Sequence, residues 1–303
     1  MSTTKQIVMP KDAILIANDN LSVAITPRFG AIYNIWDNGV PMLWQPGYAK
    51  QSVTPIGGCF PLIPYANRVK NGFFTLANKK YQIADNHCQQ PHALHGDGWT
   101  NKWHVIERGN TWIKLGHRSH LYPFDYSAEQ IIKILDKSLS IDIKITHLGK
   151  NPMPYGLGFH PWFIKHDNTE LFAPASHIWH EDQQHFPTTL SQVPAHLDFS
   201  TRHKKLPSGF INNLFLGWTA NDKQQYKADI VYPNTQQMIN IQSSQLLNRY
   251  MLYQSHSEFF CFEPVSHDVN AHNSHNMPGL KLLTTNQSIT ANLRMRFSRM
   301  LMD

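Results

Sequence analysis

The sequence contains few cysteines, few charged residues and no long apolar segment. The three cysteines, Cys59, Cys88 and Cys261, are too few and too widely spaced for a disulfide scaffold in a chain of 303 residues. Their odd number is typical of reduced thiols, which indicates a cytoplasmic protein. No segment has the roughly 18 apolar residues of a membrane helix, and residues 1–10 lack the apolar core of a signal peptide. We therefore expect a cytoplasmic protein with no membrane partner.

Charged residues make up only 16% of the chain, which excludes a coiled coil and most disordered proteins. The net charge of +6 arises from 27 basic and 21 acidic residues that are scattered along the sequence, with one small basic cluster at residues 202–205. Because nucleic-acid-binding proteins usually gather basic residues on one face, we expect no nucleic-acid partner. Hydrophobic residues at 41% and aromatic residues at 12% are sufficient for a large core.

Short alternating segments indicate β-strands rather than long amphipathic helices. Residues 21–26, 139–146 and 287–297 alternate apolar and polar side chains, as strands with one buried face do. Residues 131–135 precede the second of these segments across Asp136-Lys137, a gap of hairpin length. Further strands are expected at residues 112–116, 228–232, 238–242 and 250–253.

This pattern predicts an all-β fold, a large antiparallel β-sandwich whose strands are separated by Gly, Pro and Asn. No internal repeat or Gly/Ser linker divides the chain, so we expect a single domain over residues 1–303. About ten residues at its N-terminus are expected to be flexible. Residues 176–208 are polar and contain several prolines, and we expect them to form a long irregular excursion.

Glu263 is the most informative single residue. It follows the apolar residues 259–262, which predict a buried strand, and precedes Pro264, whose missing N–H is expected to end the hydrogen-bonded ladder. A carboxylate at such an edge loses part of its hydration, which raises its pKa and suits it to act as a base. A glutamate paired with a basic residue is the structural alternative.

Four further segments combine aromatic residues, glycine or proline, and a polar group. Arg68 lies among apolar residues, and its rigid fork of donors suits the oxygen acceptors of a ligand, with a structural ion pair as an equal alternative. His92 and His95 are three residues apart, but the glycines that follow them indicate a loop, where this spacing does not indicate a metal site. Trp99 is either a platform for the apolar face of a sugar or a core residue.

His160 lies in an aromatic, glycine-containing segment, residues 155–163, where partial loss of hydration suits an imidazole to proton donation. A core histidine without a catalytic role is the alternative. Asn212 and Asn213 lie among apolar residues, and their amides suit either the recognition of hydroxyl groups or an Asx turn.

In their order along the chain, these segments resemble the aldose 1-epimerase family, the galactose mutarotases, over residues 21–297. The resemblance rests on Asn67-Arg68 with Gly72 and Phe74, His95-Gly96, His160-Pro161-Trp162-Phe163, residues 212–215 and Glu263-Pro264. It implies a sandwich with a sugar cleft on one concave sheet, a small-molecule sugar as partner, and no metal or organic cofactor. We expect a monomer or a weak homodimer.

The resemblance also implies residue roles, with His160 matching the family's general acid and Glu263 its general base. Interconversion of α and β anomers needs a proton taken from the C1 hydroxyl and another delivered to the ring oxygen, by groups on opposite sides of the bond that opens. Closure on the other face of C1 reverses the two roles. The positions matched to sugar contacts are Asn67, Arg68, His95 and Trp162.

Two positions depart from the family's pattern. Asn212 stands where an aspartate usually binds sugar hydroxyls, and Met251 stands where a glutamine is common. Because an amide accepts on one side and donates on the other, we expect Asn212 to bind free hexoses less tightly than an aspartate there would.

Three other functions compete with an epimerase of free aldohexoses. A hexose-6-phosphate 1-epimerase would use the same acid–base pair and extra cations, for which Lys70 and residues 202–205 are candidates. A sugar-binding or regulatory module would have no need of both His160 and Glu263. A metallohydrolase is disfavoured because the 18 histidines are dispersed without the spacing of a metal site.

Overall fold

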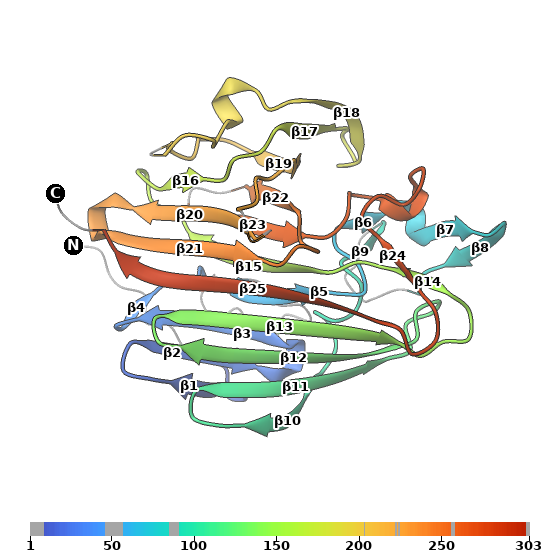
Figure 1. The fold of residues 1–303 in the computed structure, drawn as a ribbon, viewed down its shortest axis with the longest axis horizontal. Coiled ribbons are helices and arrows are strands. Elements are labelled where there is room, and N and C mark those ends of the chain that lie inside the picture. The colour runs from blue at the N-terminus through green and yellow to red at the C-terminus, as the bar shows by residue number, and fades with distance from the viewer. Residues whose placement is uncertain are drawn as a thin grey trace.

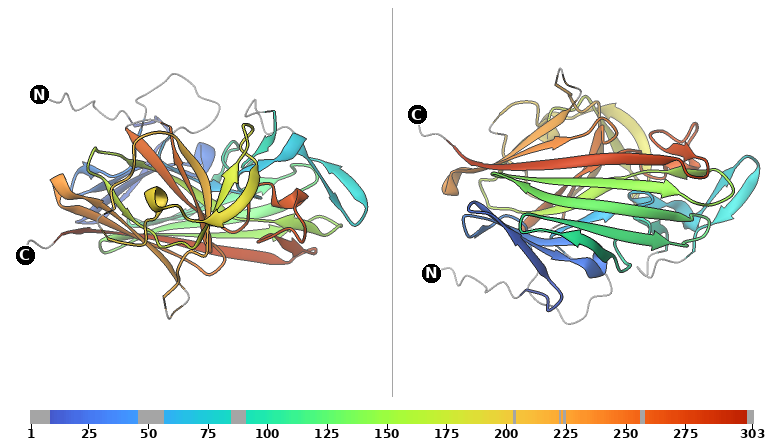
Figure 2. Two further views of the ribbon diagram at one scale, coloured as in Figure 1. Left: turned by 90° about the horizontal axis from the view of Figure 1, so that it is seen from above. Right: turned by 60° about the horizontal axis from the view of Figure 1, so that its bottom comes forward.

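Two antiparallel sheets lie face to face in the computed structural model of the protein (Figure 1). The structure describes residues 9–45, 57–84, 91–202, 204–221, 223, 225–255 and 258–300. Two further views show the sheets as separate layers, with the hairpin of β7 (Phe73–Leu76) and β8 (Lys79–Gln82) projecting at one end (Figure 2).

The larger sheet has 11 strands. Its spatial order is β1 (Ile14–Ala17), β2 (Leu21–Thr26), β3 (Ala31–Asp37), β5 (Cys59–Leu62), β15 (Gly158–Ile164), β23 (Phe259–Val265), β22 (Arg249–Gln254), β19 (Ile211–Leu216), β17 (His177–Glu181) and β18 (Pro187–Gln192), with β4 (Val40–Pro41) paired to β3. β5, which lies beside β15, and β22, which lies beside β23, therefore come from distant parts of the chain.

The smaller sheet has eight strands. Its spatial order is β10 (His104–Arg108), β11 (Trp112–Ser119), β12 (Tyr126–Leu135), β13 (Ser138–His147), β25 (Ser288–Arg299), β21 (Gln237–Ser243), β20 (Tyr226–Tyr232) and β16 (Glu170–Phe172). Two other two-stranded ribbons are β14 (Met153–Tyr155) with β24 (Lys281–Leu283), and β6 (Arg68–Val69) with β9 (Ala93–Leu94). Short 3-10 turns occur at η1 (Pro27–Phe29), η2 (Lys70–Gly72), η3 (Ala195–Leu197), η4 (Pro233–Thr235) and η5 (Ala271–Asn273).

The all-β antiparallel sandwich predicted from the sequence is confirmed. The hairpin predicted at Asp136-Lys137 joins β12 to β13, with Leu135 paired to Ser138. The other predicted strands overlap β2, β11, β20, β21, β22 and β25. The described residues form no α-helix, and none of their helical turns is long and apolar enough to cross a membrane.

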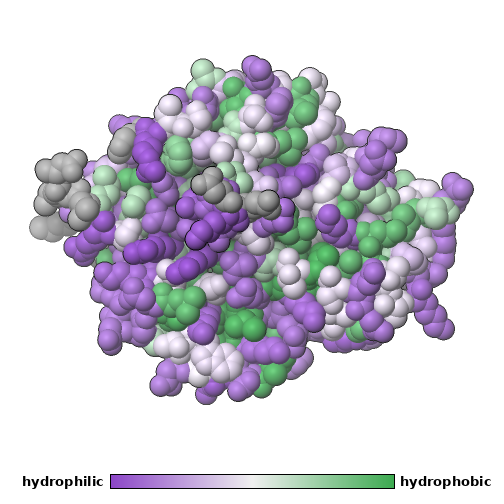
Figure 3. Space-filling model, viewed as in Figure 1, coloured by the Kyte–Doolittle hydropathy of each residue, from purple (hydrophilic) through white to green (hydrophobic). Residues whose placement is uncertain are grey.

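β13 shows why these segments form strands. Ile141, Ile143 and Ile145 are buried, whereas Asp142 and Lys144 between them are exposed. β-Branched side chains suit a pleated surface with one buried face, and burial of each isoleucine contributes about 1.5–3 kcal/mol. The apolar cluster that they join also includes Ile25 of the facing sheet. The opposite face of this smaller sheet forms a mostly hydrophilic surface with scattered apolar patches (Figure 3).

The irregular excursion predicted for residues 176–208 is correct only in its second half: the described residues from 193 to 208 form no strand and contain only the short turn η3 and an isolated bridge at Lys205. β17 and β18 form a hairpin that extends the larger sheet beyond β19, with Ile178 paired to Phe215. β18 is the edge strand, and most of its side chains are exposed. The prediction was wrong for residues 177–192 because an edge strand that is exposed to solvent on both faces lacks apolar alternation in its sequence.

Two sequence predictions concern residues outside the described part of the chain. The flexible N-terminus falls mainly on residues 1–8, and Cys88 lies in the gap between residues 84 and 91. The other two cysteines, Cys59 and Cys261, are buried free thiols in neighbouring parts of the larger sheet.

Candidate active site

His160 of β15 and Glu263 of β23 face each other across neighbouring strands. The register of these strands, which pairs Trp162 with Cys261, puts His160 opposite Glu263. Nε2 of His160 lies 3.3 Å from Oε1 of Glu263. The residues predicted as acid and base therefore lie side by side on the sheet rather than on opposite sides of a substrate bond.

Pro264 does not end the strand, contrary to the prediction from the sequence. β23 continues to Val265, and Pro264 is paired with Tyr250 of β22. The ladder between β23 and β15 skips the segment that contains Pro161 and Pro264, each of which lacks an N–H. The prediction was wrong because a proline removes only one donor, and its neighbours still pair with β22. Glu263 thus lies inside the sheet.

Burial controls the protonation of this pair. Glu263 is 3% exposed and His160 is 7% exposed. Burial raises the pKa of Glu263 to about 8, and the charge of Arg68 opposes this shift. Burial lowers the pKa of His160 to about 3. Between pH 3 and pH 8 the pair therefore holds one proton. Paired acid–base catalysis requires this state, in which one group can give a proton and the other can take one.

Aromatic rings hold the imidazole of His160 in place. Its ring stacks on Phe60 and on Trp162, with centroids 4.6 Å and 5.4 Å away. The ring of His95 meets it nearly at a right angle, with centroids 5.4 Å apart. Nδ1 of His160 is buried and has no hydrogen-bond partner among the described residues. Stacking therefore orients Nε2 toward Glu263.

Arg68 reaches the pair from the ribbon of β6 and β9. Burial lowers the pKa of its guanidinium, and the nearby carboxylates of Glu181 and Glu263 oppose that shift. Oδ1 of Asn67 accepts hydrogen bonds from the backbone N–H of Arg68 at 2.8 Å and from its Nη1 at 3.4 Å. The charge of Arg68 therefore acts on two carboxylates, and Asn67 positions its guanidinium.

His95 presents a donor of fixed orientation. The backbone N–H of Asn67 donates to His95 Nδ1 at 2.9 Å, so the imidazole carries its hydrogen on Nε2. Burial lowers the pKa of His95 well below its usual range, so the ring is neutral. Gly96 has a φ of +65°, and a Cβ there would lie 2.1 Å from the carbonyl oxygen of Ile63. The loop therefore needs glycine at this position, and it places a neutral donor beside His160.

Glu181 is a residue of this site that sequence reasoning missed. Asn212 Nδ2 donates to Glu181 Oε2 at 2.7 Å, and His185 Nδ1 lies 2.8 Å from Oε1. Burial raises the pKa of Glu181, while His185, Arg68 and Asn212 lower it. No sequence signal pointed to Glu181, because it lies in the segment that was predicted to be irregular. Asn212, predicted alone, is one half of a carboxylate–amide pair.

The floor of the site between these polar groups is apolar. Met251 lies opposite Glu263 on β22 and is 4% exposed. Trp99 is also buried and stacks on Phe60, with centroids 5.3 Å apart. Both belong to one apolar cluster that includes Leu214. Trp99 therefore packs under the site as a core residue and is not an open platform.

Cys261 adds a third potential metal donor. His160, Cys261 and Glu263 each bring one ligand atom within 4.8 Å of the others. Nitrogen, sulfur and carboxylate oxygen are donors that Zn²⁺ takes in proteins. Burial raises the pKa of the Cys261 thiol well above its usual range, so the thiol is protonated and does not favour a cation. An ion at this position would also occupy both groups that the sequence predicts as acid and base.

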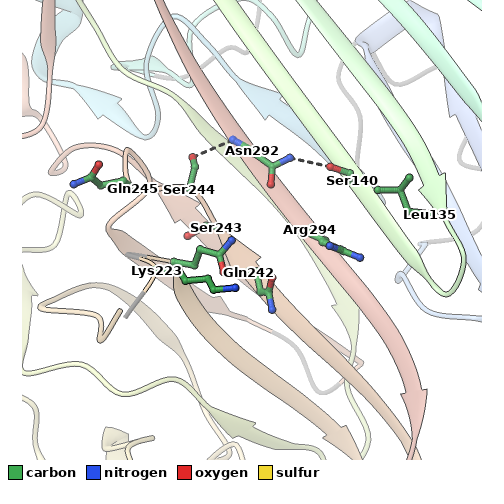
Figure 4. Close-up of a pocket in the computed structure, with 10 residues that line it drawn as sticks. Leu135, Ser140, Lys223, Gln242, Ser243, Ser244, Gln245, Asn292 and Arg294 are labelled. Atoms are coloured by element: carbon green, nitrogen blue, oxygen red, sulfur yellow. Dashed lines mark hydrogen bonds between the residues drawn. The ribbon is translucent and has the colours of Figure 1, made fainter. Parts of the chain in front are cut away.

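A polar hollow of about 440 Å³ lies on the smaller sheet, away from these residues. Its walls come from β13, β25 and β21 and from the segments beside them (Figure 4). Asn292 donates to Ser140 Oγ at 2.8 Å and, through its backbone N–H, to Ser244 Oγ at 3.0 Å. None of the predicted site residues lines this hollow, so it forms no part of the acid–base site.

Comparison with known proteins indicates one family. A profile described as aldose 1-epimerase matches residues 12–296. The uncharacterized protein YphB of Escherichia coli K12 is 29% identical over 292 residues, which cover 93% of this chain and 97% of that protein. A crystal structure of an Escherichia coli K12 protein, described as a candidate aldose 1-epimerase, has a TM-score of 0.88 at 26% identity and covers 95% of this chain and 99% of that one. The fold is also that of a galactose 1-epimerase from Lactobacillus acidophilus, with a TM-score of 0.77 at 14% identity and coverage of 97% and 98%.

Proposed function

The chain belongs to the aldose 1-epimerase family, as the match over residues 12–296 shows, and from this premise we propose that it interconverts the α and β anomers of a free aldohexose as a single-domain enzyme. The observation that carries the proposal is the buried pair of His160 Nε2 and Glu263 Oε1, 3.3 Å apart. Transfer of NMR magnetisation between the two anomers of a sugar tests it directly.

The side-by-side geometry of the pair fits ring opening. O1 and O5 of an aldopyranose are both bonded to C1, so neighbouring groups can hydrogen-bond one oxygen each. Ionised Glu263 takes the proton of O1, the C1–O5 bond breaks as the C1 carbonyl forms, and protonated His160 gives its proton to O5. Rotation about C1–C2 presents the other face of the aldehyde, and closure reverses both transfers. Each positioned group contributes about 10²–10⁴-fold.

Arg68 and His95 support the charged form of the pair. In the sugar-free protein the shared proton lies on Glu263, because its pKa is the higher of the two. Sugar hydroxyls that donate to this carboxylate act together with the charge of Arg68 to favour its ionised form, and the proton moves to His160. The Nε2–H of His95 donates to a sugar oxygen on which charge develops during opening.

The competing functions have less support. A phosphate group would need spare cations, but Arg202 pairs with Asp229 of β20 in the smaller sheet, and Lys204 donates to the backbone oxygen of Ala195. These members of the basic cluster are therefore engaged away from the acid–base pair. A sugar-binding module gains nothing from burying a carboxyl next to an imidazole, because burial of an ionisable group costs free energy.

The pH dependence of exchange is expected to follow the single proton of the pair. Glu263 has a pKa of about 8, so at higher pH the pair loses the proton that His160 must deliver, and kcat/KM falls about tenfold per pH unit. Toward pH 3 the pair gains a second proton and loses its base. Exchange rates measured from pH 5 to 10, corrected for uncatalysed mutarotation, should decline above pH 8. A rate that rises through pH 8 would contradict the assignment.

Exhaustive chelation is expected to leave exchange unchanged, because only side-chain protons take part in the proposed chemistry. The measurement compares exchange rates before and after dialysis against EDTA, with the metal content of both samples determined. Loss of activity that added zinc restores would instead identify the donors His160, Cys261 and Glu263 as a working metal site.

A further inference from the structure

We propose that His267 and Asn270 are positioning residues, which hold the backbone around Arg68 so that its guanidinium acts on the carboxylate of Glu263. Their role rests on the proposed function, in which the charge of Arg68 helps Glu263 to ionise as the sugar ring opens. Both residues lie in the segment that follows β23, directly after the strand of Glu263. That segment hydrogen-bonds to the segment of Arg68, although the two are about 200 residues apart in sequence.

The guanidinium of Arg68 depends on the backbone for its position. Its charge acts on the carboxylates of Glu181 and Glu263, but among the residues that the structure describes it forms no ion pair with either. Its side chain donates to Oδ1 of Asn67, the residue before it, which lies 3.4 Å from Nη1. A side chain whose acceptor is the adjacent residue moves with the backbone that carries both. The contacts that fix this backbone therefore set the distance from the guanidinium to Glu263, on which their Coulomb interaction depends.

Asn270 binds the backbone of Arg68 and of the segment after it. Its backbone N–H donates to the carbonyl oxygen of Arg68 at 3.0 Å, and its Oδ1 accepts from the backbone N–H of Lys70 at 2.9 Å. Nδ2 of Asn273 donates to the same Oδ1 at 2.9 Å and so fixes its direction. Asn270 has a φ of +57°, a left-handed conformation that asparagine adopts more readily than most residues. Asn270 therefore ties β6 to the segment that follows β23.

His267 fixes the backbone on the other side of Arg68. The backbone N–H of Ala66 donates to Nε2 of His267 at 2.9 Å, so the ring carries its hydrogen on Nδ1, which lies 2.8 Å from the backbone oxygen of Asp268. Burial lowers the pKa of His267 to about 4, so the ring is neutral. Gly156 packs against it, and a Cβ at that position would lie 2.0 Å from Cδ2 of His267. The ring is therefore a fixed acceptor for the chain two residues before Arg68.

The segment that carries both residues is itself anchored to the larger sheet. The carboxylate of Asp268 accepts a hydrogen bond from Arg249 of β22 and another, at 3.3 Å, from Nε1 of Trp179 of β17. β22 pairs with β23 along the residues on both sides of Glu263. The backbone of Arg68 is therefore positioned relative to the strands that surround Glu263.

A displaced guanidinium would change how readily Glu263 ionises. Burial raises the pKa of Glu263, and the positive charge of Arg68 opposes that shift. If this charge moves away, the pKa of Glu263 rises further, because the Coulomb interaction weakens with distance. The acid–base pair then keeps its proton to a higher pH, but its carboxyl group is harder to ionise when a sugar binds. We therefore expect slower exchange together with an alkaline decline at higher pH, a combination that loss of folded protein does not produce. The other titratable groups that act on Glu263 or Arg68 are His160, Cys261, Tyr253, Glu181, His92 and His95.

The test measures anomer exchange of glucose and galactose against pH in three variants. Asn270→Gly removes Oδ1 but keeps a residue that tolerates positive φ, and His267→Leu removes the acceptor for the N–H of Ala66. Each is expected to lower kcat/KM about tenfold and to move the alkaline decline up by about 0.5 pH unit. His267→Gln returns an acceptor near the position of Nε2, and we expect its kcat/KM within about threefold of wild type.

Two matched controls change the same residue types away from Arg68. Asn286→Gly alters an exposed asparagine with a φ of +66° in the loop before β25. His147→Leu removes a buried histidine of β13 whose two ring nitrogens bond to Tyr155 and Asn151. Both controls should keep the alkaline decline of wild type, even where they lower thermal stability.

Arg68→Met shows whether the two residues act through the guanidinium. This variant is expected to lower kcat/KM about 100-fold and to move the alkaline decline up by about one pH unit. Adding Asn270→Gly to Arg68→Met should lower kcat/KM by less than about twofold more, because no charge is left to displace. A full tenfold further loss in the combined variant would overturn the assignment of Asn270 as a positioning residue of Arg68.

The titration of Glu263 itself separates this inference from the proposed function. It is followed by ¹³C NMR on protein labelled at the δ-carbon of glutamate, with the signal assigned by its absence in Glu263→Gln. Asn270→Gly and His267→Leu are expected to raise the midpoint by about 0.5 pH unit, and Asn270→Gly alone decides if His267→Leu does not fold. If wild type exchanges anomers but the midpoint and the alkaline decline stay in place, the inference is overturned and the epimerase function stands. If the midpoint rises but even wild type exchanges no sugar, the placement of Arg68 stands and the epimerase function fails.

Discussion

Replacing Glu263 by glutamine is expected to lower anomer exchange by roughly 10²–10⁴-fold, because glutamine keeps the shape of the side chain but cannot take a proton. The same change is expected to stabilise the fold at alkaline pH. The pKa of Glu263 is raised by burial from 4.5 to about 8, so between these values the folded state binds a proton that the unfolded state lacks. The contribution of Glu263 to the free energy of unfolding is fully present below pH 4.5 and is lost as the pH rises through 8. Glutamine avoids that loss, and we expect the free energy of unfolding to rise by about 4 kcal/mol at pH 8 and hardly at all at pH 4.5.

Exchange rates and thermal unfolding at pH 5 and pH 8 check both parts of this prediction. Glu170→Gln is the matched control, because Glu170 is also a buried strand glutamate but lies on β16 of the smaller sheet. That variant should exchange anomers at the wild-type rate. Near wild-type exchange by Glu263→Gln would show that Glu263 is not the base, and an equal stability change at both pH values would show that its pKa is not raised.

Replacing His160 by glutamine is expected to lower exchange by a similar factor, since the ring oxygen loses its proton donor. Unlike Glu263→Gln, this variant is expected to be less stable at pH 8. It loses the stacking on Phe60 and Trp162, and each aromatic pair contributes about 0.5–1.5 kcal/mol. Burial lowers the pKa of His160 from 6.5 to about 3, so wild type loses stability as the pH falls below 6.5 while glutamine does not. The difference between variant and wild type should therefore shrink at pH 5.

The same two measurements, exchange and thermal unfolding, apply to His160→Gln. His180→Gln is the control, because His180 is an exposed strand histidine whose Nε2 bonds to Ser191 Oγ. Retained exchange in His160→Gln would remove the proton donor from the proposed mechanism. Opposite stability shifts at pH 8 for the two inactive variants would show that loss of activity is not a consequence of unfolding.

Much of the fold follows from local patterns in the sequence. The alternation of residues 139–146 indicates a half-buried strand because every second side chain must face the core, and β13 has that burial pattern. The composition of β18 carries no such signal, since its side chains are mostly exposed. The prediction that Pro264 ends the strand was wrong because a proline removes only one hydrogen-bond donor. The other residues of β23 remain paired with β22 on both sides of Pro264.

The candidate site was also partly predictable from local patterns in the sequence. His160 and Glu263 each stand out within their own segments, as polar residues among aromatic and apolar neighbours. Their contact depends on the register of strands about 100 residues apart in sequence, which no local pattern encodes. Glu181 could not be found from its neighbours in sequence, because it interacts with Asn212 and Arg68, which come from other segments.

The central claim, that His160 and Glu263 exchange the anomers of a free aldohexose, is tested most directly by two-dimensional NMR exchange spectroscopy on glucose and galactose near pH 7. Wild-type protein at micromolar concentration should produce cross-peaks between the α and β C1 proton signals that disappear in both Glu263→Gln and His160→Gln. Cross-peaks of equal intensity in wild type and both variants, or their absence with wild type over a panel of free and phosphorylated aldoses, would contradict it.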